Sequence, residues 1–88
     1  MIKTDITISN KLGLHARAAA KLTKLAAGYP CEVWMSKGER RINAKSIMGV
    51  MMLAAARGST LVIEADGADE REAVEALRQL IDSGFGED

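Results

Sequence analysis

His15 is the only histidine in the chain, and Arg17 follows it two residues later, at the start of an alanine-rich stretch. Residues 16–27 are predicted to form a helix, so His15 would stand at its N-terminus. The unpaired backbone N–H groups at such an end bind anions. A phosphoryl group on the imidazole would meet these groups, and Arg17 would donate charge-assisted hydrogen bonds to its oxygens. The pattern indicates a phosphoryl-carrying histidine; a plain surface or capping histidine is the alternative that these residues leave open.

The rest of the sequence has no sign of a self-sufficient catalytic site. No cluster of His, Cys, Asp and Glu suggests a metal site, and no Gly-rich loop of the Walker type is present. We therefore expect no metal and no cofactor, and the phosphoryl group would have to come from another protein. Such a chain would be a phosphoryl-transfer carrier rather than a stand-alone enzyme.

A second informative segment runs from Lys45 to Leu53 and is apolar on nearly every side. Ser46 fits the N-cap of a short helix over residues 47–56. We expect Val50 and Leu53 to face inward. Ile47, Met48 and Met51 are expected to face solvent; the alternative is that most of these side chains are core residues. Exposed Ile and Met beside basic residues are typical of a protein docking site. The residues predicted to bind partners are Arg17, Lys21, Lys24, Lys45, Ile47, Met48 and Met51.

The chain has 88 residues, which predicts one domain over residues 1–88. Its formal net charge is zero, but residues 11–57 hold nine Lys and Arg against two acidic residues. A basic face of this kind would attract phosphate groups, nucleic acid or an acidic protein surface, unless it is only a solvated face. The aromatic residues Tyr29, Trp34 and Phe85 are scattered and form no stacking platform, so we expect no nucleic-acid partner.

Cys31 is the only cysteine, so no intrachain disulfide can form, and its strand-like surroundings predict that it is buried. The sequence has no signal peptide and no apolar run long enough to span a bilayer. We therefore expect a cytoplasmic protein without membrane insertion. We also expect it to be a monomer.

Alternating apolar residues predict strands over residues 1–9, 31–36, 40–43 and 60–66. Helical spacing predicts helices over residues 16–27 and 47–56, and a last helix that begins at Asp69 and ends at Gly84. Asp69 and Glu72 have the spacing of a capping box. The order βαββαβα indicates an α+β fold in which the helices cover one face of the sheet.

These residues resemble the HPr family, the histidine-containing phosphocarriers of the bacterial phosphoenolpyruvate-dependent sugar phosphotransferase system. The resemblance covers essentially the whole chain and rests on Gly-Leu-His-Ala-Arg at 13–17 and Lys-Ser-Ile-Met at 45–48, separated by the family's interval. It implies an open-faced β-sandwich, with an antiparallel four-stranded sheet under three helices. It also implies that His15 accepts a phosphoryl group from enzyme I and donates it to an enzyme IIA domain, with Arg17 assisting. Ser46 matches the position that a regulatory kinase phosphorylates in some members.

Ala18 departs from the family's pattern, which often has proline at that position. With the run at residues 46–53, this departure leaves open the nitrogen-related branch of the same system, in which a paralogue carries phosphate to a regulatory enzyme IIA. A more remote alternative, from another functional class, is a small regulator that binds partners without phosphotransfer.

Overall fold

The computed structural model describes residues 1–86, so the last two residues of the predicted domain lie outside the described part. Four strands and three helices follow one another in the predicted order βαββαβα. They are β1 (Ile2–Thr7), α1 (Ala16–Ala27), β2 (Glu32–Lys37), β3 (Arg40–Asn43), α2 (Ile47–Met52), β4 (Thr60–Asp66) and α3 (Glu70–Asp82), with a short 3-10 turn at Gly84–Gly86.

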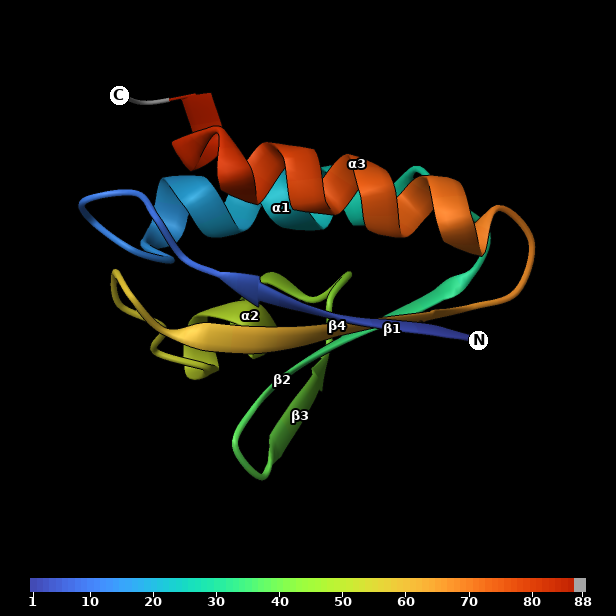
Figure 1. Cartoon of the computed structure of the whole chain (residues 1–88), viewed down its shortest axis with the longest axis horizontal. Helices are drawn as coiled ribbons and strands as arrows, with labels where there is room; N and C mark the ends of the chain where they lie inside the picture. Colours follow the sequence, from blue (N-terminus) through green and yellow to red (C-terminus); the bar gives the residue numbers. More distant parts are fainter. Residues whose placement is uncertain (87–88) are drawn as a thin grey trace.

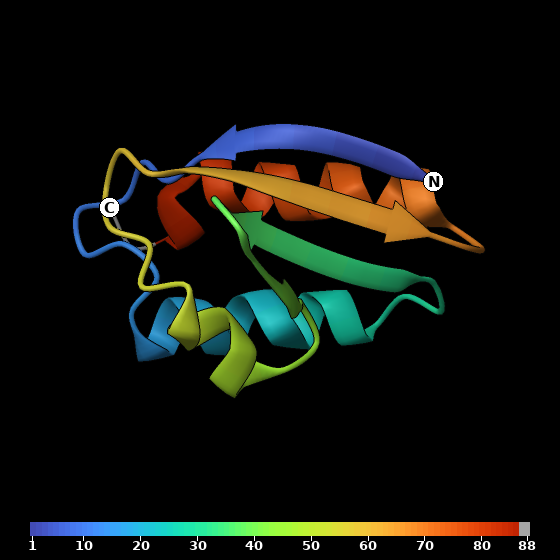
Figure 2. The same ribbon diagram turned by 90° about the horizontal axis from the view of Figure 1, so that it is seen from below.

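The four strands form one antiparallel sheet in the order β1-β4-β2-β3. Figure 2 shows β4 lying between β1 and β2, the two strands that it pairs with. The register sets Ile2 opposite Ala65 and Met35 opposite Ile63, so apolar residues of neighbouring strands share one face. The fold is the α+β open-faced sandwich predicted from the sequence.

Helices α1 and α3 run side by side over the apolar face of the sheet (Figure 1). The shorter α2 packs against α1 and against β3. Buried side chains from both layers meet between them, with Leu22 from α1, Leu77 and Ile81 from α3, and Met35 and Ile63 from the sheet. Burial of each such side chain contributes about 1.5–3 kcal/mol, so this layer contact stabilises the fold.

The face of the sheet opposite the helices is covered by its own side chains. Arg41 donates to both carboxylate oxygens of Glu64 at 3.3 Å, and its guanidinium carbon lies 4.3 Å from the centroid of the Trp34 ring. Glu64 is buried although it lies on this open face, because Trp34 is its neighbour in the register and Arg41 covers it. Arg41, from the basic part of the sequence, therefore has a structural role.

Three sequence predictions about these elements need correction. Helix α2 ends at Met52 rather than at residue 56, because Ala54 adopts a left-handed conformation with φ of +49°. The capping box of Asp69 and Glu72 does not form: Asp69 is itself left-handed, with φ of +63°, and its side chain makes no capping hydrogen bond. Instead Glu70 accepts a hydrogen bond from the Gly67 N–H at 3.1 Å. Strand β2 begins at Glu32, one residue after the buried Cys31.

None of the helices within residues 1–86 is long and apolar enough to cross a membrane.

Candidate functional site

His15 is the N-cap residue of α1 and has an extended backbone, with φ of −75° and ψ of 176°. Its carbonyl accepts the first bond of the helix, from the Ala19 N–H at 2.9 Å. The His15 side chain itself makes no capping hydrogen bond to the helix. The N–H groups of the first turn therefore lack a side-chain acceptor from the cap position, which favours an anion beside His15.

Arg17 and Ala18 occupy the first turn of α1, directly after His15. Arg17 is exposed, whereas Ala18 is fully buried in the core. Alanine therefore fits this position, where the family pattern often has proline, and the helix begins at the predicted residue. The half-buried His15 and the exposed Arg17 are thus brought to one helix end, as the sequence predicts.

The loop before His15 is folded by Asn10, which the sequence analysis did not single out. Asn10 is fully buried, and its side-chain amide donates to the Gly13 carbonyl at 2.8 Å. The Gly13 N–H donates back to the Asn10 carbonyl at 3.2 Å, and the His15 N–H donates to the Gly13 carbonyl at 2.9 Å. An Asn that opens a Gly-containing loop is typical of such a turn, so a sequence signal was present.

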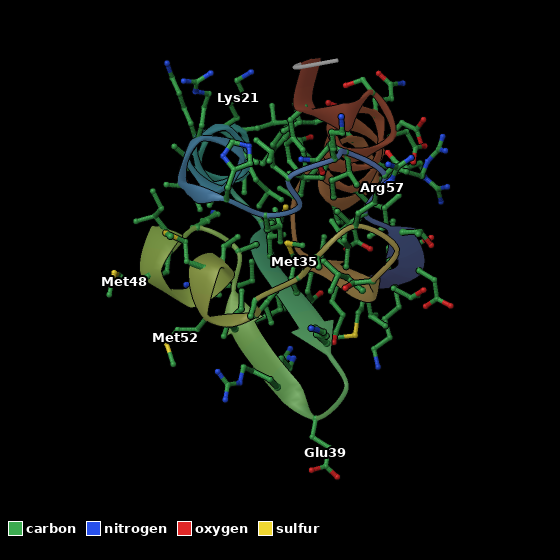
Figure 3. The ribbon with its side chains drawn as sticks, turned by 90° about the vertical axis from the view of Figure 1, so that its left-hand side faces the viewer. Lys21, Met35, Glu39, Met48, Met52 and Arg57 are labelled. Atoms are coloured by element: carbon green, nitrogen blue, oxygen red, sulfur yellow. The ribbon has the colours of Figure 1, made fainter. Side chains whose placement is uncertain are left out.

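The segment after α2 holds this loop in place. The Leu14 N–H donates to the Ala55 carbonyl at 2.9 Å. Gly13, with φ of +67°, approaches the same segment so closely that an added Cβ would lie 2.6 Å from the Ala55 carbonyl oxygen. The left-handed Ala54 turns the chain just before this contact. Figure 3 shows this end of the molecule, with Arg57 labelled in the segment.

Helix α2 presents an apolar patch beside the site. Ser46 caps it, accepting a hydrogen bond from the Gly49 N–H at 3.1 Å, as predicted. Val50 and Leu53 are buried and Met48 is 70% exposed, so the predicted inward and outward faces are confirmed. Met52, which is 57% exposed, was not predicted as part of the patch. We define the α2 patch by its exposed residues Ile47, Met48, Met51 and Met52.

Gly49 permits α2 to lie close to β3. A Cβ at this position would come within 3.3 Å of the Ile42 Cβ and 3.4 Å of the Asn43 carbonyl oxygen. The other end of the helix is held by the β2–β3 hairpin, where Arg40 donates to the Met52 carbonyl at 2.9 Å and Lys37 to the Ala54 carbonyl at 3.3 Å. The close approach of α2 to β3 explains why a glycine stands at position 49, although glycine is unfavourable inside a helix.

Two predicted partner-binding lysines make internal hydrogen bonds. Lys45 donates from Nζ to the Tyr29 carbonyl at 2.7 Å, just beyond the end of α1. Lys21 donates from Nζ to the Phe85 carbonyl, also at 2.7 Å. In Figure 3, Lys21 projects from α1 on the side away from Met48 and Met52. The predicted docking residues thus occupy two sides of α1.

Residues 1–86 contain no group of three or more His, Cys, Asp or Glu side chains that could hold a metal ion. The site is therefore assembled from one imidazole, one guanidinium and backbone N–H groups. Such a set can bind and orient an anion, and the imidazole can act as a nucleophile.

Comparisons with known proteins agree with this geometry. A family model described as "PTS HPr component phosphorylation site" matches residues 2–83. The chain is 60% identical to the phosphocarrier protein HPr of Cupriavidus necator, over 99% of this chain and 98% of that protein. It is 40% identical to the phosphocarrier protein NPr of Shewanella violacea, over 98% of this chain and 94% of that one. A crystal structure of HPr-C-His from Thermoanaerobacter tengcongensis superposes with a TM-score of 0.96 at 44% identity, covering 100% of this chain and 99% of the other.

We predict that Gly13→Ala destabilises the protein more than Gly38→Ala does. Both glycines have positive φ, so alanine at either position costs about 1 kcal/mol of backbone strain. Only at Gly13 would the Cβ meet backbone atoms, whereas nothing lies within 4 Å of it at Gly38. Urea unfolding should give a loss about 1–3 kcal/mol larger for Gly13→Ala. Equal losses would mean that residues 55–56 yield freely and do not hold the loop.

Proposed function

Because the chain belongs to the HPr family, the phosphocarrier proteins of the phosphotransferase system, we propose that His15 accepts a phosphoryl group from enzyme I and donates it to an enzyme IIA domain. The observation that carries this proposal is the position of His15. It is the half-buried N-cap residue of α1, and the exposed Arg17 lies in the first turn of the same helix.

The transfer needs only a nucleophile and a place for negative charge. A nitrogen of the neutral imidazole attacks the phosphorus, and a P–N bond to His15 forms as the bond to the donor breaks. The first-turn N–H groups and the Arg17 guanidinium bind the phosphoryl oxygens, where charge is concentrated. A phosphohistidine is labile, so the same steps in reverse order deliver the group to the acceptor.

Partner recognition is assigned to the α2 patch and to the basic residues Arg17, Lys21, Lys24 and Lys45. The patch is exposed and borders the segment that holds the His15 loop. Methionine side chains adapt their shape, which suits a carrier that must bind a donor and several acceptors in turn. The cations would steer an acidic partner surface toward His15.

Ser46 is a candidate site for a regulatory serine kinase. Its Oγ lies at the start of α2 and already accepts the Gly49 N–H, so a phosphate there would have a backbone donor at hand. The added charge would stand next to Ile47 of the α2 patch. Phosphorylation would thereby change the docking surface without touching His15.

The acceptor distinguishes two branches of the system. We propose the sugar-uptake branch, since the similarity to proteins named HPr reaches 60% identity, against 40% for the protein named NPr. Carriage of phosphate to a regulatory enzyme IIA of the nitrogen-related branch is the alternative. Transfer from the phosphorylated protein to purified enzyme IIA of each branch separates them.

We predict that enzyme I and labelled phosphoenolpyruvate label the parent protein and leave His15→Ala unlabelled. His15 is the only histidine, so no other imidazole can substitute for it. Acid-labile, base-stable label identifies the phosphohistidine. If His15→Ala is labelled as well as the parent, the carrier proposal fails; if neither is labelled, the chain is a regulator that binds without phosphotransfer.

We predict that Arg17→Ala slows phosphoryl transfer about tenfold to a hundredfold, which corresponds to the loss of one or two charge-assisted hydrogen bonds. Arg17→Lys should recover part of the rate, because it keeps the charge and loses the guanidinium fork. Arg71→Ala, which removes an exposed cation from α3, is the matched control and should keep the parental rate. A matching fall in thermal stability of Arg17→Ala would instead identify Arg17 as structural.

We predict that Met48→Glu weakens docking to enzyme I about tenfold, because it places a charge in the apolar centre of the α2 patch. Gln79→Glu adds the same charge on α3, away from α2, and should leave the affinity unchanged. Titration calorimetry measures both dissociation constants. An unchanged value for Met48→Glu removes the patch from the interface.

A further inference from the structure

An open groove of about 650 Å³ is lined by residues of α1, of the turn after it and of α3. Figure 1 shows these two helices side by side in the helical layer. The lining residues are Lys21, Lys24, Leu25, Gly28, Tyr29 and Leu80. The groove is open to solvent rather than enclosed, so a ligand would lie along it with one side exposed. Neither His15 nor any residue of α2 is in the lining, so the groove is distinct from the phosphoryl-transfer site.

The floor of the groove is apolar. Leu25, Tyr29 and Leu80 pack against the core and remain half-buried, so each leaves part of its side chain for a ligand. Leu80 comes from α3 and the other two from α1 or the residues just after it, and together they hold the groove between two fixed elements. A floor of this kind suits a hydrocarbon chain or a ring.

The polar groups in the lining are mainly cationic. Lys21 and Lys24 are three residues apart on α1, both are exposed, and none of the six lining residues within the described chain is acidic. The Lys21 ammonium is held at 2.7 Å by the Phe85 carbonyl. The Phe85 side chain is buried in the core, which holds this acceptor in place. An ammonium has three donors, and two remain for an anion.

We propose that this groove binds an amphipathic anion, that is, a short acyl chain or aromatic ring carrying a carboxylate or a phosphate. The apolar part lies on Leu25, Tyr29 and Leu80, and the head group pairs with Lys21 and Lys24. The two lysines are also assigned to partner recognition, so a bound anion would screen part of that basic surface. Binding itself does not depend on phosphoryl transfer, and it can be measured on the isolated protein.

The test is a titration of the 15N-labelled protein, followed by its backbone amide resonances. Octanoate and octyl phosphate are the two anionic probes, and their relative affinity distinguishes a carboxylate site from a phosphate site. Octyltrimethylammonium has the same tail with the opposite charge, and acetate has the head group without the tail. We expect saturable shifts at Leu25, Tyr29 and Leu80 with the anionic probes, with a dissociation constant on the order of 1 mM for about ten heavy atoms.

Two variants locate the binding. Leu80→Glu puts an anion into the floor and should abolish the shifts, whereas its neighbour Gln79→Glu adds the same charge outside the lining and should not. Lys24→Gln should weaken binding about fivefold, as expected for one exposed charge pair, with Lys11→Gln as its matched control. Circular dichroism and a thermal melt establish that each variant is folded.

Four results would overturn the proposal. One is the absence of saturable shifts with both anionic probes. The second is equal binding of octyltrimethylammonium, and the third is unchanged binding in both Leu80→Glu and Lys24→Gln. The fourth is a shift of Leu80 and Tyr29 on addition of an enzyme IIA with no response to octanoate, which would assign the groove to protein docking. None of these results bears on the labelling of His15, so the groove and the carrier function fail separately.

Discussion

The loop before His15 is fixed to the rest of the protein by a backbone contact between Gly13–Leu14 and the Ala55 carbonyl. The contact is close enough to exclude any side chain at position 13 without movement of residues 55–56. It joins the entry of α1 to the chain that leaves α2, so His15 and the α2 patch are connected through one short segment. The half-buried imidazole is therefore fixed at the surface of the protein, as the proposed transfer between two partners requires.

Cationic side chains hold several connecting segments in place through hydrogen bonds to backbone carbonyls. Lys45 donates to the backbone just after α1, and Arg40 and Lys37 donate to carbonyls at the end of α2. Each of these carbonyls is at or beyond a helix C-terminus, where backbone acceptors lack partners and a positive charge is favoured. The basic segment of the sequence is thus partly a set of helix caps, and its excess charge overstates the basic surface offered to partners.

Local signals in the sequence were sufficient for both ends of α1 and for the start of α2. Helix α1 has its predicted bounds because Gly28 and Pro30 stop it, and Ser46 caps α2 as its side chain predicts. The end of α2 could not be predicted, because alanine has no preference for the left-handed conformation that Ala54 adopts. Its surroundings impose that conformation. The same holds for Asp69. Its spacing to Glu72 is that of a capping box, but its backbone is left-handed rather than extended. Long-range contacts were missed altogether: Ala55 against Gly13, and Leu80 beside Lys24 in the groove.

The strand order also determines when the sheet can form. Both β1 and β2 are joined to β4, and β1 has no other strand partner in the described chain. The pairing of Ile2 with Ala65 closes a loop of more than sixty residues. The entropy cost of closing such a long loop slows folding. During synthesis, β1 stays unpaired until residues 60–66 have been made. Until β4 pairs with the other strands, the apolar faces of α1 and of the β2–β3 hairpin remain exposed to chaperones and to aggregation.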